Sequence, residues 1–230
     1  MKAAIRTTYG PPEVIRVETV EKPVPKAEEI LVKVHATTVN RTDCAILTGW
    51  PLAMRLFTGW RAPRLPILGT DFAGEVEAVG AAVTTFRAGD RVFGFDDNGQ
   101  GSQAQYVAVS EKKAVVLMPP NSTYAQAAAS AEGAHYAVNF LNKIKVQPGQ
   151  KVLLNGATGA IGSALLQILA HAGAEVTAVC GGTHGEWARS AGAARVIDFT
   201  KTDFTRFYET FDFVFDAVGK STFGKCKPLL

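Results

Sequence analysis

The sequence predicts two domains, a small β-barrel domain over residues 1–120 followed by an α/β domain over residues 121–230. Three observations predict this division. In the first part, short runs of Val, Ile and Phe alternate with turn residues, which is typical of a barrel or sandwich. After Met118-Pro119-Pro120 the composition changes to an alanine-rich stretch that favours helix. Beyond it, strands alternate with helices, which indicates βαβ units around a parallel sheet.

The elements of the first part are expected where β-branched and aromatic residues are bounded by Gly, Pro or Asp. These strands are 30–34, 74–79, 91–95 and 106–109. The segment 44–66 departs from this pattern, because it is apolar and basic and contains Trp50, Phe57 and Trp60. We expect loop and short helix there, either as a packed surface excursion or as a wall of a substrate cleft.

The elements of the second part follow from apolar runs that alternate with helical spacing. We expect a helix over 124–143 that is interrupted at Gly133, because glycine disfavours helix interiors. The sequence further predicts strands at 152–154, 175–179, 195–197 and 211–216, and helices at 161–172 and 184–191.

Composition excludes several classes of protein. With 47% hydrophobic and 20% charged residues among 230, the chain is neither disordered, collagenous nor a coiled coil. Its 24 basic and 21 acidic side chains are scattered, so nucleic acid is not expected as a partner. The three cysteines, Cys44, Cys180 and Cys226, are far apart, which favours a reducing cytoplasm. The uncharged stretch 152–174 is rich in glycine and polar residues, so we expect it inside the protein and not in a membrane.

A glycine-rich turn carries the strongest chemical signal. Gly156-Ala157-Thr158-Gly159-Ala160-Ile161-Gly162 follows a predicted buried strand and opens a predicted helix. Such a turn lets the backbone approach a pyrophosphate, whose charge then lies at the helix N-terminus. The spacing is G-x-x-G-x-x-G, and small residues at these positions also serve ordinary packing of a helix on a strand. Dinucleotide binding is our interpretation, and packing alone is its alternative.

The end of the next strand bears on which dinucleotide is bound. NAD sites usually carry an acidic residue there, about 20 residues after the first glycine, to bind the ribose hydroxyls. This chain has no acid in the segment 180–184, and Arg189 lies one turn further on. Gly181, Thr183 and His184 leave room and hydrogen-bond donors for a 2′-phosphate, although His184 is equally interpreted as a solvated residue at a helix start. We therefore expect NADPH in preference to NADH.

Taken together, these motifs resemble the medium-chain dehydrogenase/reductase superfamily, on its zinc-independent quinone-oxidoreductase (zeta-crystallin-like) branch. The resemblance covers essentially the whole chain, and its most telling stretches are 9–14, 34–43, 66–74, 89–92, 155–162, 196–198 and 215–219. It implies a GroES-like catalytic domain followed by a Rossmann dinucleotide-binding domain. Relatives continue for about another hundred residues, so the Rossmann domain is expected to be truncated after its fourth strand, and a homodimer is expected at full length.

The same resemblance implies which residues form the site. The backbone of 157–161 would hold the pyrophosphate, and Gly181, Thr183 and His184 would lie near the 2′-phosphate. Ala217, Val218 and Gly219 would line the nicotinamide-ribose side. Asn40 would face the nicotinamide, although an Asn there also caps loops. Tyr136 would donate a hydrogen bond to a developing enolate, although a buried Tyr is commoner as core.

No metal is expected. Zinc-dependent relatives have a Cys where this chain has Asn40 and a His-Glu pair where it has Thr70-Asp71, and they carry a cysteine cluster that is missing here. Without a Lewis acid, hydride donation to an electron-poor carbon is easier than alcohol oxidation. The resemblance therefore implies an NADPH-dependent reductase of quinones or α,β-unsaturated carbonyls. The alternatives are a non-catalytic or truncated member that binds nucleotide or a protein partner and, less favoured, an alcohol dehydrogenase.

Overall fold

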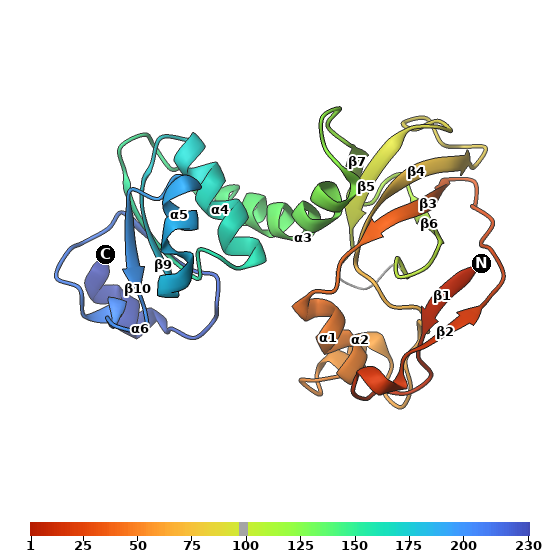
Figure 1. Cartoon of the computed structure of the whole chain (residues 1–230), viewed down its shortest axis with the longest axis horizontal. Helices are drawn as coiled ribbons and strands as arrows, with labels where there is room; N and C mark the ends of the chain where they lie inside the picture. Colours follow the sequence, from red (N-terminus) through yellow and green to blue (C-terminus); the bar gives the residue numbers. More distant parts are fainter. Residues whose placement is uncertain (97–100) are drawn as a thin grey trace. The chain divides into compact units, whose positions relative to one another are not determined.

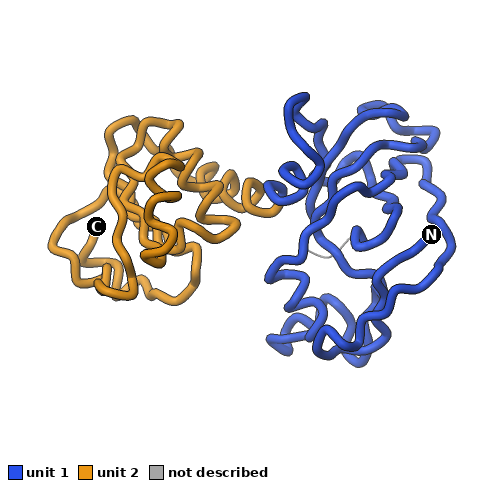
Figure 2. The backbone as a smooth tube through the Cα atoms, in the orientation of Figure 1, with its two compact units in different colours: residues 1–131 blue, residues 132–230 orange. Residues whose placement is uncertain are grey.

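The computed structural model describes residues 1–96 and 101–230, which form two compact units, Met1–Ala131 and Glu132–Leu230 (Figure 2). The order of their helices and strands can be followed in Figure 1.

The first unit is built on an antiparallel sheet with the strand order β6-β3-β4-β5-β7. Its strands are β3 (Glu29–Thr37), β4 (Asp71–Val79), β5 (Arg91–Phe95), β6 (Tyr106–Ser110) and β7 (Val115–Leu117). Ile30, Val32, Phe72 and Val76 alternate along β3 and β4 and form the centre of the core. Within each strand they are an even number of positions apart, which places them on one face of the sheet.

Three short strands escaped prediction. β7 has three residues, and β1 (Lys2–Ile5) and β2 (Arg16–Thr19) have four each. β1 and β2 pair antiparallel, with Lys2 opposite Thr19, and no residue of β2 is buried. A strand with no buried face has no hydrophobic alternation, so the sequence carries no pattern for it. The segment 44–66 does contain short helix, as expected: α1 (Arg41–Thr48) runs into it and α2 (Met54–Thr58) lies within it.

The second unit is a parallel sheet with the strand order β10-β9-β8-β11. Its strands are β8 (Lys151–Asn155), β9 (Glu175–Cys180), β10 (Arg195–Asp198) and β11 (Phe213–Asp216). All four are predicted, although β11 begins two residues later than expected. The chain returns from β10 at one edge to β11 beside β8, so the strand order reverses next to β8. In open α/β sheets, ligands bind at the carboxyl ends of the strands where the order reverses.

Both faces of this sheet are covered. Val152 and Leu154 of β8 pack on one face with α4 (Ala160–His171) and α5 (Gly185–Ser190), through residues such as Leu165 and Ala188. Leu153, between them in sequence, packs on the other face with residues of 204–211 and with Leu229. There α6 (Phe223–Cys226) and the following turn complete the cover. A strand buried on both faces explains the continuous apolar run that the sequence shows.

The expected interruption at Gly133 is wrong. α3 is one continuous helix from Tyr124 to Leu141. A Cβ at Gly133 would lie 2.4 Å from the carbonyl oxygen of Ala160, the first residue of α4. The glycine therefore lets α3 approach α4 closely instead of breaking the helix. Among the described residues, no helix combines the length and apolar character needed to cross a lipid bilayer.

Candidate functional site

The glycine turn lies between β8 and α4, at the carboxyl end of the sheet. Gly156 has a φ of +81°, which side-chain-bearing residues rarely adopt. A Cβ there would also lie 2.4 Å from Cγ2 of Val218, in the turn after β11. Both the positive φ and the nearby Val218 side chain therefore require a glycine at position 156. The structure thus brings Val218 to the first glycine of the turn.

The other two glycines of the turn differ in what they contact. A Cβ at Gly162 would lie 2.0 Å from the carbonyl oxygen of Gly156, so this glycine is needed for the close packing of helix and turn. A Cβ at Gly159 would meet only the Gly156 oxygen, at an ordinary 3.6 Å, and the φ of Gly159 is −76°. Packing against the residues that the structure describes therefore gives no reason for a glycine at 159. An external group that approaches the backbone there supplies one.

The first turn of α4 has unused hydrogen-bond donors. Gly159 is the N-cap, it offers no side chain for capping, and the first turn contains no acidic residue. The first described helical bond is from Ser163 N–H to the Gly159 carbonyl, so Ala160, Ile161 and Gly162 N–H groups find no acceptor among the described residues. Gly159 and Ala160 are exposed. Free N–H groups and the positive end of the helix dipole together favour an anion at this position.

Asp216, at the end of β11, fixes the turn that follows it. Its Oδ1 accepts hydrogen bonds from Asn155 Nδ2 (3.0 Å), Val218 N–H (3.0 Å) and Gly219 N–H (3.1 Å). Its Oδ2 accepts one from Ser221 N–H (2.8 Å).

Partial burial acts to raise the pKa of Asp216, but the hydrogen bonds from Ser221, Val218, Gly219 and Asn155 outweigh it and lower that pKa. Ala217 also donates its N–H to the Asn155 carbonyl, at 3.0 Å. The predicted residues Ala217, Val218 and Gly219 are thereby anchored beside the end of β8.

The end of β9 carries the residues expected near a 2′-phosphate. Gly181 follows β9, and Thr183 and His184 are exposed on the short 3-10 turn Gly182–His184. Arg189 of α5 points back toward this turn, because its Nη1 would lie 3.7 Å from a Cβ at Gly185. One positive side chain thus lies beside Gly185, the residue that directly follows the turn.

A carboxylate that the sequence argument missed lies at the same place. A Cβ at Gly182 would be 2.3 Å from Oδ2 of Asp198, which ends β10. Asp198 accepts hydrogen bonds from Thr200 Oγ1 (2.7 Å) and Thr200 N–H (3.0 Å), which lower its pKa. The register of the parallel sheet opposes Asp198 to Cys180, so only a correct strand alignment would have revealed the contact. The segment that follows β9 thus has the positive Arg189 beside Gly185 and the negative Asp198 beside Gly182.

Asn40 occupies the centre of a polar cluster in the first unit. Its Oδ1 accepts the N–H of Asp43 (2.8 Å), which caps α1. Its Nδ2 donates to Thr70 Oγ1 (2.7 Å) and Asp71 Oδ2 (2.8 Å), and both partners are buried. The structure thus brings together Asn40, Thr70 and Asp71. The side-chain amide presents N–H donors to this cluster, which suits hydrogen bonding and does not suit a cation. Within the described residues, no three His, Cys, Asp or Glu side chains are grouped as metal ligands would be.

Tyr136 lies in the second unit, in the C-terminal half of α3 and one turn beyond Gly133. It is half-buried, and its ring meets that of His135 edge to face, with centroids 5.5 Å apart. Its neighbour Ala137 is completely buried in the core with α4. Tyr136 belongs to the second unit and Asn40 to the first, and the role of each stays a prediction.

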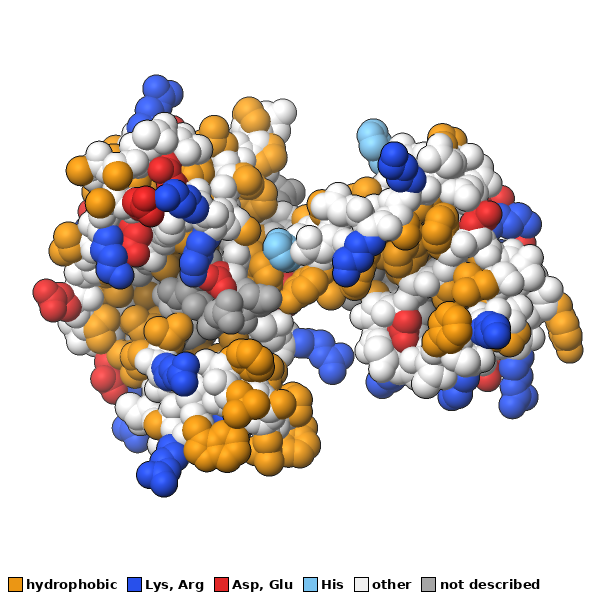
Figure 3. Space-filling view, turned by 180° about the vertical axis from the view of Figure 1, so that it is seen from behind, with side chains coloured by type: hydrophobic (Ala, Val, Ile, Leu, Met, Phe, Trp, Pro, Cys, Tyr) orange, Lys and Arg blue, Asp and Glu red, His pale blue; other side chains and the backbone are white. Residues whose placement is uncertain are grey.

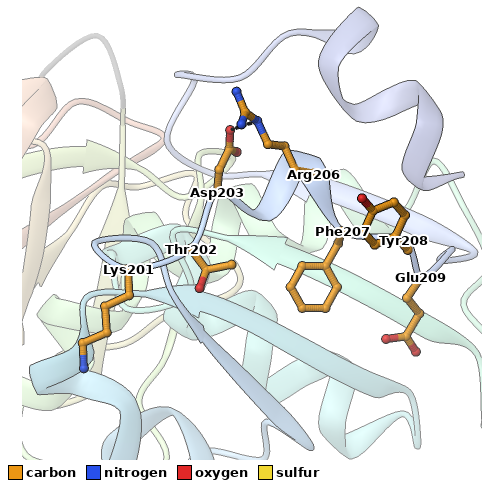
Figure 4. A pocket seen from close by; sticks show the side chains of 7 residues that line it. All are labelled: Lys201, Thr202, Asp203, Arg206, Phe207, Tyr208 and Glu209. Atoms are coloured by element: carbon orange, nitrogen blue, oxygen red, sulfur yellow. Dashed lines mark ion pairs between the residues drawn. The ribbon is translucent and has the colours of Figure 1, made fainter.

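A pocket of the second unit lies away from the glycine turn. It is lined by Lys201, Thr202, Asp203, Arg206, Phe207, Tyr208 and Glu209, all from the connection between β10 and β11 (Figure 4). Asp203 and Arg206 form an ion pair at 3.5 Å. None of the predicted site residues lines this pocket, so we do not assign the cofactor to it.

The two units define a class of protein: an antiparallel β domain, followed by a parallel α/β sheet whose glycine turn is suited to a dinucleotide. Residues 26–120 match the alcohol dehydrogenase GroES-like domain. The chain belongs to the medium-chain dehydrogenase/reductase superfamily, and the relatives that it matches are quinone and alkenal oxidoreductases.

Individual relatives agree with this assignment. The chain is 34% identical over 230 residues to 2-methylene-furan-3-one reductase of Solanum lycopersicum, across 96% of this chain and 58% of that protein. It is 32% identical over 229 residues to the chloroplastic NADPH-dependent alkenal/one oxidoreductase of Arabidopsis thaliana, across 95% of this chain and 58% of that protein. The quinone oxidoreductase of Escherichia coli complexed with NADPH superposes with a TM-score of 0.84 at 25% identity, across 100% of this chain and 70% of that one. The chain thus spans a little under three fifths of the length of the curated relatives from Solanum lycopersicum and Arabidopsis thaliana.

Replacing Gly159 tests whether the turn binds a nucleotide. Gly159→Val should abolish the rise in melting temperature that NADPH produces, because the added side chain occupies the approach to the backbone. It should leave the melting temperature without nucleotide nearly unchanged, since the Cβ meets nothing closer than 3.6 Å. The measurement is thermal unfolding with and without NADPH.

Two further glycines serve as references for this experiment. Gly162→Ala should lower the melting temperature itself, because its Cβ would clash with Gly156. Gly224→Ala should change neither quantity, since a Cβ there meets no atom within 4 Å. Gly173 would be a poor control, because its φ is +81° and its Cβ would press on Pro148. A nucleotide-induced rise that survives in Gly159→Val would contradict the assignment.

Asp216 should contribute to stability in a pH-dependent way. Because its pKa is lowered in the folded protein, its contribution is present above the unfolded value of about 4 and is lost as pH falls through the folded pKa. Asp216→Asn should lower the free energy of unfolding by about 1–2 kcal/mol at pH 7, and the difference from wild type should shrink toward pH 2. Urea unfolding over this pH range measures it. A difference that is constant with pH would refute this role.

Proposed function

We propose that the protein is an NADPH-dependent, zinc-independent reductase that transfers a hydride to a quinone or an α,β-unsaturated carbonyl. One observation carries the proposal: α4 begins with three N–H groups that have no acceptor in the described part of the chain, beside a glycine that packing of the described residues does not require. This combination suits a pyrophosphate. In this proposal residues 1–120 form the GroES-like catalytic domain, and residues 121–230 form part of the Rossmann dinucleotide-binding domain.

The choice of NADPH over NADH rests on the end of β9. Gly181 leaves space for a phosphate, and Thr183, His184 and Arg189 offer donors or positive charge. Asp198 opposes this preference by its negative charge, but its carboxylate already accepts hydrogen bonds from Thr200 and lies 3.9 Å from Lys201 Nζ. Two of the proteins named above, from Arabidopsis thaliana and Escherichia coli, are described with NADPH, which supports the same choice.

The proposed reaction assigns roles to two further residues. NADPH supplies the hydride when it is bound. Asn40 faces the nicotinamide end in this proposal, held rigid by its bonds to Thr70, Asp71 and the start of α1. Its amide donors favour zinc-independent chemistry at the position where zinc-dependent relatives carry a ligand. The Tyr136 hydroxyl donates a hydrogen bond to the enolate oxygen that forms as the hydride arrives. We further propose a homodimer at full length and a cytoplasmic location.

Steady-state kinetics test the proposal. NADPH oxidation should be supported by a small naphthoquinone or an alkenal, and a zinc chelator should leave the rate unchanged. Gly181→Asp should shift the ratio of NADPH to NADH affinity by tenfold or more toward NADH, because the carboxylate repels a 2′-phosphate. The substitution fits, since a Cβ there lies 3.8 Å from the Phe199 ring. Gly224→Ala is the matched control.

Three outcomes would count against the proposal in different ways. Tighter binding of NADH by the unmodified protein would overturn the cofactor choice. Activity that is lost with the chelator and restored by zinc would overturn zinc independence. NADPH binding with no turnover of any quinone or enone would overturn the reductase activity and favour a nucleotide-binding protein without catalysis.

A further inference from the structure

The first unit has a concentration of exposed apolar side chains outside the candidate site. We call it the 50–65 patch, after the segment that carries it. Its large side chains are each between 51% and 71% exposed, and they are Trp50, Leu52, Leu56, Phe57, Trp60 and Leu65. In Figure 3, hydrophobic side chains gather on this part of the unit with basic side chains among them. Contiguous apolar patches of this kind mark interaction surfaces on folded proteins.

The exposed side chains of the patch are distinct from the buried side chains that hold the segment in place. Ile46 and Leu47 of α1 are buried together with Leu68, and Met54 of α2 packs against them. Tyr9 also holds the segment, by hydrogen bonds from its hydroxyl to the Gly59 carbonyl (2.6 Å) and with Thr58 Oγ1 (2.8 Å). The segment is thus anchored by one set of side chains, and a separate set points outward.

The charge around the patch is mainly positive. The segment 44–70 contains Arg55, Arg61 and Arg64 and no acidic residue. Arg61 and Arg64 are exposed, and neither forms an ion pair with a described residue. Arg55 is held by stacking over the Tyr9 ring at 4.6 Å. Glu13 lies on the adjoining 3-10 turn Pro12–Val14, so one negative charge stands against these three positive ones.

We propose that the 50–65 patch binds peripherally to anionic lipid membranes. Tryptophan is enriched at the boundary between headgroups and acyl chains, where its ring is amphipathic. Phe and Leu add buried apolar area, and arginines are attracted to the negative surface of phosphatidylserine-rich bilayers. A second copy of the chain is a poorer occupant, because a symmetric dimer would place the arginines of one patch against those of the other.

This inference goes beyond the proposed reductase and does not depend on it. Vesicle binding concerns the first unit, whereas nucleotide binding is tested at Gly159 of the second. Either result can fail without the other.

Tryptophan fluorescence tests the proposal directly, with vesicles of phosphatidylcholine alone or with 30% phosphatidylserine as probes. In a Trp187→Phe background, only Trp50 and Trp60 remain to report. Their emission should shift to the blue and be quenched by brominated lipid when the phosphatidylserine vesicles are added. Arg61→Gln and Arg64→Gln should each weaken binding to these vesicles about fivefold, since each basic residue near such a surface contributes a comparable factor. Raising the salt concentration should weaken binding as well.

Matched variants distinguish vesicle binding by the 50–65 patch from nonspecific adsorption of the protein to vesicles. Phe57→Ser should reduce vesicle binding at least tenfold, whereas Val24→Ser, at an even more exposed apolar residue of the same unit, should not. Arg16→Gln, at an exposed arginine outside the patch, is the charge control. Circular dichroism checks that each variant is folded. The proposal is overturned if emission does not shift with anionic vesicles, or if Val24→Ser and Phe57→Ser behave alike. The proposal is also overturned if the unmodified protein forms dimers that do not bind vesicles and Phe57→Ser abolishes these dimers, because the patch would then bind a second copy of the chain.

Discussion

One carbonyl group holds the turn on which the candidate site depends. The oxygen of Val179, near the end of β9, accepts the N–H of Gly156 at 3.0 Å and that of Ala157 at 3.2 Å. These two bonds tie the chain leaving β8 to the neighbouring strand, so that the next residues must turn away into α4. Asp216 binds the end of β8 from its other side, through Asn155. The turn is thus fixed between two strands, and the open start of α4 follows from that constraint.

The fixed turn explains why its three glycines have three physical roles. Gly156 adopts a positive φ, Gly162 lies too close to the Gly156 carbonyl for any side chain, and Gly159 has neither constraint. Packing therefore accounts for two of them and leaves the third for an approaching ligand. The spacing of glycines in the sequence does not distinguish these roles, because it records only which residues lack a Cβ.

The sequence predicted the architecture well, because that information is local. All four strands of the parallel sheet and the glycine turn are confirmed, since buried parallel strands are continuous apolar runs.

The errors of the sequence-based prediction concern contacts between distant segments. Gly133 was expected to interrupt a helix, and only the nearness of Ala160 shows its packing role. Asp198 was overlooked because strand register, and not sequence spacing, places it beside Gly182. Asp216 lay in a recognised motif, but its four hydrogen bonds depend on how the chain folds back after β11.

The central claim is that unused N–H groups at the start of α4 bind the pyrophosphate of a dinucleotide. Amide ¹H–¹⁵N spectra of the assigned protein during titration with NADPH test it at single residues. The amide signals of Ala160, Ile161 and Gly162 should move together and saturate, with downfield proton shifts that report new hydrogen bonds. Saturating binding in which these three signals stay in place, while others move, would contradict it.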